Sequence, residues 1–328
     1  MRPLVRTVLR GSLDRIHHVA AVRPAAARGT VAAVYAQAER DFGALAPPVA
    51  LHSPHPGVLA AAWTMLRETL LVEGRVGRAA KETVATAVSE ANSCPYCAEV
   101  HGAAADAGGG RPAGRLADWV RDGGAATGPP PGPPDRAPEL IGTAVTFHYL
   151  NRMVNVFLDG SPLPPALPPA ARGTMLRVVA GALRSREPGG PAPGVSRALL
   201  PAAPLPGDLA WAAPRPHIAG AFARAAAAIG AAGESALPGP TRELVLDRLA
   251  GWDGAPLGPG RPDGPAAALA PAARPAARLA LLTALASYRV TPADIAAVRA
   301  DDRTLVGITA WASLAAARRA GALLAGEG

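Results

Sequence analysis

The sequence predicts an all-α protein, and three features of its composition support that prediction. Hydrophobic residues make up 49% of the 328 positions, so the chain can bury a substantial core. Alanine, leucine and valine are the commonest of these hydrophobic residues, whereas aromatic residues account for only 4% of the chain. Runs rich in β-branched residues are few, and clusters of proline and glycine punctuate the chain. Helix is therefore the favoured element almost everywhere outside those clusters.

The chain opens with a basic, amphipathic segment. Leucine, valine and isoleucine recur at three- and four-residue spacing over residues 4–16, while the arginines lie largely off that stripe. This pattern predicts an opening helix that packs on the core, and attachment to a membrane surface is the alternative. No apolar run has the length of an export signal or a membrane span, so we expect a cytoplasmic protein outside the membrane.

Further helices are predicted between the breaks, because apolar residues recur there at helical spacing. The predicted blocks span residues 30–42, 57–71, 75–89, 95–107, 139–157, 169–184, 218–229, 241–249, 275–288, 292–300 and 304–324.

Three segments rich in proline and glycine cannot sustain a helix, and they divide the chain. They span residues 122–138, 187–216 and 251–265. We expect the first to be a surface loop, the second a connector and the third a break within the carboxy-terminal half. The predicted organisation is a helical domain over residues 1–160, a helix with a connector over 161–216, and a second helical repeat over 217–328.

The second repeat is inferred from a weak echo between residues 79–101 and 276–298. Both segments have the order helix, break, proline, helix, with Pro95 aligned on Pro292. In the later copy Thr291 can cap the helix and Asp294 can close a capping box. Because no cysteine occurs in that copy, we expect a catalytically silent partner that packs pseudo-symmetrically on the first half. The assembly would then contain fewer chains than that of single-repeat relatives.

The charge of the chain does not point to nucleic acid. The formal net charge is +8 with an isoelectric point near 10.6. The arginines are scattered singly, and no basic stripe is interleaved with aromatic residues as in nucleic-acid-binding surfaces. We therefore expect no nucleic-acid partner.

Both cysteines of the chain lie in the segment "SEANSCPYCAEVH", residues 89–101. Cys94 takes a cap-like position, Pro95 suits the first position of a helix, and Cys97 falls in the first turn. The positive end of the helix dipole favours a thiolate there, so a lowered thiol pKa is expected. His101 follows Cys97 by four residues and shares its helix face, where it can accept the thiol proton. Once either thiol is oxidised, Cys94 and Cys97 are close enough to form a disulfide.

Zinc is a rival explanation for this cluster. Cys94, Cys97 and His101 could supply three ligands, and Glu82 or His148 a fourth. Structural zinc sites, however, usually draw on two well-separated ligand pairs, which the chain lacks. Two buried apolar cysteines are the second rival explanation, but a proline and a tyrosine at the helix start argue against it.

Other features near the motif have simpler interpretations. Haem attachment requires histidine directly after the second cysteine, and Ala98 stands there instead. His148 could line the pocket or complete a helix interface, and the interface is favoured because a lone histidine in an amphipathic helix needs only one partner. Asn151 and Arg152 are expected to serve packing and helix-end contacts as much as chemistry. The histidines at positions 17, 18, 52 and 55 are expected at the surface or in turns.

Glu82 extends the motif into the preceding helical block. If residues 91–93 form a tight corner, the two helices run antiparallel and the Glu82 carboxylate can orient the imidazole of His101. Glu82 followed by Asn92, "CPYC" and His101 closely resembles the AhpD-like alkyl hydroperoxidase branch of the carboxymuconolactone decarboxylase superfamily. "VALHSPHPGVLAAAWTMLRETLL" before the motif resembles the leading helices of the family. "TFHYLNRMVNVFL" after it resembles the segment that carries Asn151 and Arg152 in peroxidase-related members. The resemblance covers roughly residues 30–160.

The resemblance implies an all-helical AhpD-like fold, a homo-oligomeric assembly and reduction of hydroperoxides by a cysteine pair without a cofactor or a metal. It assigns Cys97 to attack on the peroxide, Cys94 to resolution of the sulfenic acid, and Glu82 and His101 to a proton relay. The implied partners are a hydroperoxide and a dithiol reductant, which could be a lipoyl protein, a thioredoxin-like protein or a small thiol.

Two classes of function remain open at this point. The first is a thiol-dependent peroxidase, and the second is a redox sensor whose cysteines switch between dithiol and disulfide without turnover. A sensor needs only the cysteines, whereas turnover also needs proton delivery to the leaving group. The presence of Glu82 and His101 therefore favours the peroxidase.

Overall fold

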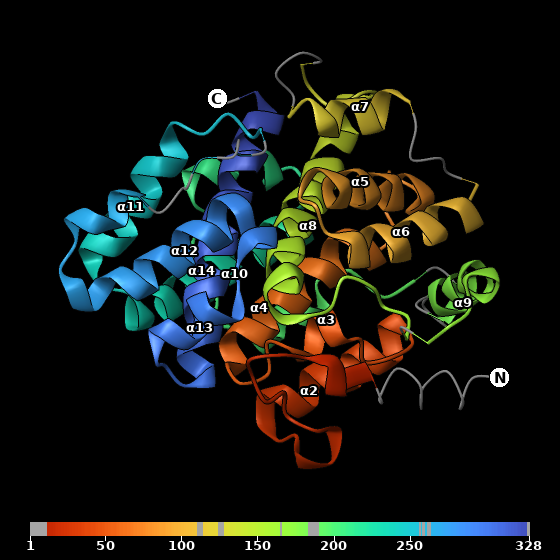
Figure 1. The fold of residues 1–328 in the computed structure, drawn as a ribbon. Coiled ribbons are helices and arrows are strands. Elements are labelled where there is room, and N and C mark those ends of the chain that lie inside the picture. Colours follow the sequence, from red (N-terminus) through yellow and green to blue (C-terminus); the bar gives the residue numbers. More distant parts are fainter. Residues whose placement is uncertain are drawn as a thin grey trace.

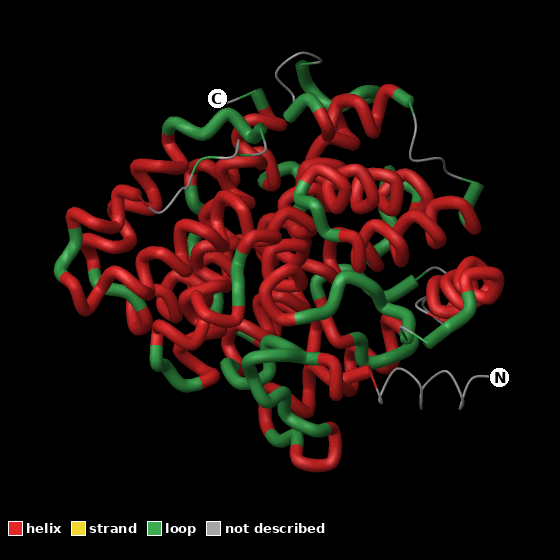
Figure 2. The backbone as a smooth tube through the Cα atoms, viewed as in Figure 1, coloured by secondary structure: helices red, strands yellow, loops and turns green. Residues whose placement is uncertain are grey.

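The computed structural model describes residues 12–109, 114–123, 128–164, 166–182, 190–255, 257, 260 and 264–326. These residues form helices joined by turns and loops, and no strand occurs among them (Figure 2). One isolated antiparallel bridge joins Ile16 to Leu158. The all-α prediction is confirmed over the described chain.

The first half of the chain builds the right side of the molecule in Figure 1 and much of its centre. Its α-helices are α2 (Gly29–Gln37), α3 (Pro47–Ala50), α4 (Pro56–Leu66), α5 (Arg78–Ala91), α6 (Pro95–Ala107), α7 (Arg115–Arg121), α8 (Ala137–Phe157) and α9 (Pro169–Ala182). Helices α2 and α4 continue as π-helical turns over η3 (Ala38–Phe42) and η4 (Arg67–Leu71), and short 3₁₀ turns are η1 (Ser12–Arg15), η2 (Pro24–Ala26) and η5 (Pro134–Arg136).

The second half is also helical. Its α-helices are α10 (Pro216–Ala236), α11 (Gly239–Ala250), α12 (Arg274–Ala286), α13 (Pro292–Val298) and α14 (Asp302–Ala325). The 3₁₀ turns are η6 (Val195–Leu199), η7 (Gly207–Ala212), η8 (Gly264–Ala268), η9 (Pro271–Ala273) and η10 (Ser287–Arg289).

Each predicted helical block coincides with a helix, but the boundaries and some connections differ. Helix α10 is longer than its block mainly because residues 230–236, which include three alanines, also propagate helix. Helices α3 and α7 were not predicted, since both are too short to show helical periodicity. Of the opening segment the structure describes η1 and the residues after it, and residues 4–11 lie outside the described residues.

Helices α8 and α14 pack along each other near the centre of the fold (Figure 1). Gly321 permits this close approach, because a Cβ atom there would lie 2.6 Å from Cγ2 of Val145. Helix α4 packs on α10 in a similar way, and one hydrophobic cluster contains residues of both halves. None of the described helices is both long and apolar enough to cross a membrane.

The packing between helices of the two halves is relevant to the predicted second repeat. Helix α4 packs on α10, and α8 packs on α14. A pseudo-twofold relation between two copies would produce both of these pairings. The capping box that the echo predicted is present, with Thr291 and Asp294 bonded to each other's backbone. The repeat itself and the three-part division of the chain remain predictions.

Candidate active site

A tight corner between α5 and α6 delivers both cysteines to the start of α6. Ser93 takes left-handed backbone angles, with a φ of 50°, which is uncommon for a residue other than glycine. The Cys94 amide nitrogen donates to the Ser89 carbonyl oxygen at 2.8 Å and closes the corner. Helix α6 then begins at Pro95, so Cys94 is its N-cap and Cys97 lies in its first turn.

One face of α8 holds this corner in place. The side-chain amide of Asn92 lies 3.1 Å from Nδ1 of His148 and donates to Oδ1 of Asn151 at 3.2 Å. One turn further along α8, Asn155 donates to the Asn92 carbonyl oxygen at 3.0 Å. Residues spaced three and four apart share a helix face, so these α8 side chains form a continuous polar surface against the corner.

Cys97 is a reduced thiol enclosed by protein. Its side chain is 4% exposed, and that of Cys94 is 1% exposed. Burial raises the pKa of the Cys97 thiol well above its usual value, and the neighbouring Cys94 raises it further. A hydrogen bond from Asn151 opposes this rise, because it stabilises the thiolate.

The prediction that the Cys97 thiol has a lowered pKa is therefore wrong. The helix start was predicted to lower the pKa of Cys97, but removal from water disfavours the charged thiolate more strongly. The residues that bury Cys97 include some from helices distant in the sequence, so the local motif could not predict this burial. Cys97 accordingly rests as a thiol and must lose its proton during any reaction as a nucleophile.

Glu82 and His101 are in direct contact, as the antiparallel arrangement required. Nδ1 of His101 lies 2.7 Å from Oε2 of Glu82, and Arg78 donates from Nε to Oε1 of the same carboxylate at 2.6 Å. Burial alone raises the pKa of Glu82, but Arg78 and His101 outweigh burial and bring it to about 2. Glu82 is 2% exposed, so it is a buried carboxylate whose two oxygens are both occupied. Sequence reasoning missed Arg78, although its spacing of four residues from Glu82 is a recognisable ion-pair signal.

The low pKa of Glu82 predicts a specific loss of stability in acid. In the folded state the pKa of Glu82 is about 2, below the ordinary 4.5, so its ionised carboxylate stabilises the fold above pH 4.5. This stabilisation is lost as the pH falls towards 2. The free energy of unfolding of the wild type should therefore drop on the order of 3 kcal/mol more than that of Glu82→Gln over this range. Urea unfolding at several pH values measures it. Glu99→Gln on α6 is the control and should follow the wild type; a Glu82→Gln slope equal to that of the wild type would contradict the assignment.

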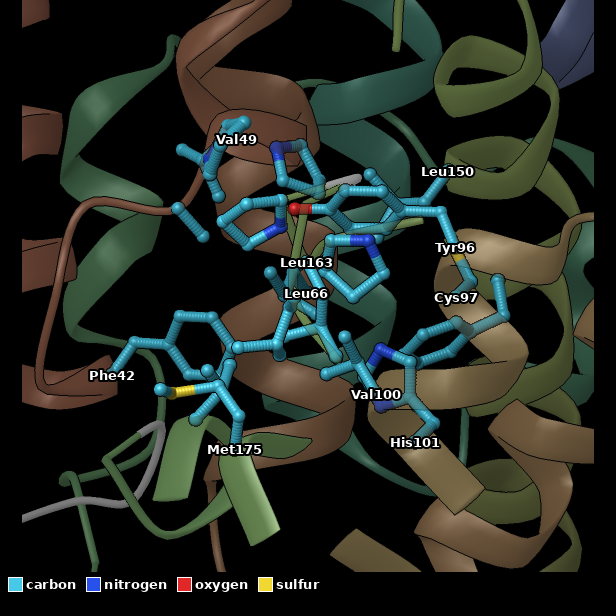
Figure 3. Close-up of a pocket in the computed structure, with 18 residues that line it drawn as sticks. Phe42, Val49, Leu66, Tyr96, Cys97, Val100, His101, Leu150, Leu163 and Met175 are labelled. Carbon is cyan, nitrogen blue, oxygen red and sulfur yellow. The ribbon is translucent and has the colours of Figure 1, made fainter. Parts of the chain in front are cut away.

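Cys97 and His101 both line one partly open cavity of about 200 Å³. Figure 3 shows Tyr96, Cys97, Val100 and His101 of α6 on one side of it and Phe42 and Met175 across from them. The His101 ring packs edge-on against Phe147 with their centroids 4.5 Å apart. Most of the lining is apolar: Phe42, Ala46, Pro47, Pro48, Val49, Leu66, Val100, Phe147, Leu150, Pro162, Leu163, Pro164, Leu167, Met175 and Val179. Cys94 is not among the lining residues.

Behind the cavity, α8 buries a histidine and an arginine. Nδ1 of His148 faces donors from both Asn92 and Arg152, so it acts as an acceptor. Burial and the Arg152 charge lower the pKa of His148 well below its usual value, which keeps the ring neutral. Burial lowers the pKa of Arg152 to about 9. The Arg152 guanidinium donates to the carbonyl oxygens of Ala284 and His148, and it lies 5.6 Å from the centre of the Trp252 ring. His148 thus lies at a helix interface, as the sequence suggested, and Arg152 ties α8 to the second half.

The remaining histidines lie away from the cavity. His17 forms an ion pair with Asp159, and His55 caps α4. His52 was expected at a surface or in a turn; it lies in a turn but is fully buried and stacks on Tyr149. Among the described residues, no group of three or more His, Cys, Asp and Glu side chains is arranged to hold a metal ion.

Comparisons with known proteins give two matches. A family model described as the carboxymuconolactone decarboxylase family matches residues 58–121, which run from α4 to α7. A protein of Mycobacterium tuberculosis (strain ATCC 25618 / H37Rv) named alkyl hydroperoxide reductase is 40% identical over 337 residues, covering 93% of this chain and 94% of that protein.

Proposed function

Because the chain belongs to the AhpD-like branch of the carboxymuconolactone decarboxylase family, we propose that it is a thiol-dependent peroxidase of the alkyl hydroperoxide reductase type. The observation that carries the proposal is the shared cavity of Cys97 and His101, with His101 bonded to Glu82 behind it. A nucleophile, a base and a group that orients the base are the parts that covalent thiol chemistry requires.

In the proposed first step, the Cys97 thiol loses its proton and the thiolate sulfur attacks the distal oxygen of the hydroperoxide. The O–O bond breaks, Cys97 becomes a sulfenic acid, and the organic part leaves as an alkoxide that takes up a proton to become an alcohol. The high pKa of Cys97 means that a base is needed for this step. His101 lines the same cavity, and we assign to it both acceptance of the thiol proton and its delivery to the leaving oxygen.

In the proposed second step, Cys94 resolves the intermediate. Its sulfur attacks the sulfenic sulfur of Cys97, the S–O bond breaks, and water and a Cys94–Cys97 disulfide are formed. The side chains of Cys94 and Cys97 are in hydrogen-bond contact, which supports this pairing. A dithiol reductant then restores both thiols by exchange; a lipoyl protein, a thioredoxin-like protein or a small thiol would serve.

Asn151 and Arg78 take supporting roles in the proposed reaction. The Asn151 amide is fully buried, donates to Ser89 at 3.1 Å and also contacts the Cys97 thiol. It therefore favours the thiolate from a fixed position. Arg78 occupies one oxygen of Glu82 and leaves the other directed at His101, which fixes the imidazole ring.

The apolar cavity makes the substrate preference a test of the proposal. Burial of hydrocarbon contributes about 0.8 kcal/mol per methylene, so cumene hydroperoxide should exceed hydrogen peroxide in kcat/KM at least about tenfold with a dithiol present. Met175→Glu places a charge in the wall and should lower kcat/KM for cumene hydroperoxide about tenfold or more while leaving hydrogen peroxide within a few-fold.

Arg177→Glu, exposed on the same helix α9 and outside the lining, is the matched control and should behave as the wild type. Wild-type protein that consumes neither peroxide would overturn the proposed function. Equal losses with both peroxides in Met175→Glu would remove the cavity as the place where the organic group binds.

A further inference from the structure

A second and larger cavity lies between α10, α11 and α14, and we call it the α10–α11–α14 groove. It encloses about 530 Å³, and none of its lining residues belongs to the Cys97 cavity. Figure 1 shows α11 at the edge of the molecule opposite α6 and α9. Its size falls within the range of roughly 300–1,000 Å³ that is typical of small-molecule sites. The proposed peroxidase reaction makes no use of it.

The walls of the groove are largely apolar. Ile229 of α10, Leu249 of α11 and Leu314 of α14 contribute hydrocarbon from all three helices. Leu246 also lines the groove and is 50% exposed, although large hydrophobic side chains are usually covered. Gly230 keeps part of the space open, because a Cβ atom at that position would meet nothing within 4 Å. An elongated hydrocarbon group would cover this surface.

Arginine side chains supply the charge of the groove. Three of them, Arg242, Arg318 and Arg319, line it together with a single acidic residue, Asp208. Arg318 is already neutralised, since its guanidinium donates through two nitrogens to the Asp208 carboxylate. The groove therefore retains the positive charge of the other two arginines.

Arg242 and Arg319 each make only weak contacts with neighbouring described residues. Arg319 donates from Nε to the Trp252 carbonyl oxygen at 3.1 Å. Nη1 of Arg242 lies 3.7 Å from the carboxylate of Glu234, which is 67% exposed, and its Nε is buried with no hydrogen-bond partner among the described residues. A carboxylate with a hydrocarbon tail matches this combination, because charge-assisted hydrogen bonds to arginine are strong and directional.

We propose that the α10–α11–α14 groove binds a free long-chain carboxylate of the fatty-acid type. The carboxylate pairs with Arg242, whose Nε is buried without a hydrogen-bond partner among the described residues, and the tail lies along Leu249, Ile229 and Leu314. A helix of an acidic partner protein fits less well. Such a helix is about 10–12 Å across, so two turns of it need more than the 530 Å³ of the groove.

Binding of palmitate is the test, measured by displacement of a fluorescent dansyl fatty acid from the full-length protein. Gly230→Leu is designed to fill the groove: the position is helical and open, and leucine is a better helix former than glycine. It should weaken palmitate binding at least about tenfold. Gly181→Leu on α9, where a Cβ atom also meets nothing within 4 Å, is the matched control and should bind as the wild type.

Charge variants test the head group in the same assay. Arg242→Gln should weaken palmitate binding at least about tenfold, whereas Arg248→Gln, exposed on α11 outside the lining, should not. Hexadecanol, which lacks the charge, should compete at least about tenfold more weakly than palmitate.

Three results would overturn the proposal. Unchanged palmitate binding in Gly230→Leu would place the ligand elsewhere, including in the Cys97 cavity. Equal competition by hexadecanol would remove the role of Arg242. Binding to vesicles of anionic phospholipid without binding of free palmitate would identify a membrane surface as the source of the anion.

Discussion

Replacement of Cys97 by serine is expected to abolish hydroperoxide reduction. A serine hydroxyl has no accessible anion at neutral pH, and only the sulfur thiolate can take oxygen from the peroxide and become a sulfenic acid. Cys94→Ser should behave differently, because its attacking thiol remains. It should consume about one equivalent of hydroperoxide in a single turnover and retain a sulfenic acid on Cys97. Peroxide consumption and mass spectrometry of dimedone-labelled peptides measure both outcomes.

The position of the two thiols supports this order of attack. Cys97 lines the cavity with His101, whereas Cys94 is buried and outside the lining. A sulfenic acid found on Cys94 in Cys97→Ser would reverse the two roles. Continued catalytic turnover by Cys97→Ser would exclude the cysteine pair as the centre of the reaction.

Loss of the relay should produce the second largest effect. General acid–base assistance contributes roughly a hundredfold or more in rate, which corresponds to about 3 kcal/mol of barrier. Because the buried Cys97 thiol has a raised pKa, His101→Gln and Glu82→Gln should each slow the peroxide step by at least that order. In both variants the rate should rise only as the pH approaches the high pKa of Cys97. Stopped-flow kinetics over a range of pH values measure these changes.

Two controls separate the relay from simple damage to the site. Diamide, a strong thiol oxidant, should still form the Cys94–Cys97 disulfide in both relay variants, and circular dichroism should report an unchanged helix content. Glu99→Gln, a carboxylate variant elsewhere on α6, should keep wild-type rates. Peroxide rates within a few-fold of the wild type in both His101→Gln and Glu82→Gln would leave the redox sensor as the better account.

Much of the site could be read from local spacing, because its main contacts are local. One turn of helix is enough to predict that α6 starts at Pro95 and that Cys97 and His101 share a helix face. The contact between Glu82 and His101 needed only a tight corner between consecutive helices. The helical blocks were predictable for the same reason, since each depends on periodicity within its own segment.

Other properties depend on segments far apart in the chain. Cys97 is buried in contact with Asn151 of α8, and this burial shifts its pKa in the direction opposite to the one its helix position suggests. Asn151 of α8 contacts the Cys97 thiol and Met175 of α9 lies across the cavity from it, and no short-range pattern predicted either position. The α10–α11–α14 groove likewise joins helices whose packing the sequence did not predict.

The most direct test of the peroxidase account is a single turnover of the fully reduced wild-type protein with cumene hydroperoxide. The account predicts about one equivalent of 2-phenyl-2-propanol per chain and loss of the mass of two hydrogens from the protein. Peptide mapping should find that loss as a disulfide between Cys94 and Cys97. Recovery of intact hydroperoxide, or alcohol formation with both cysteines still reduced, would contradict the account.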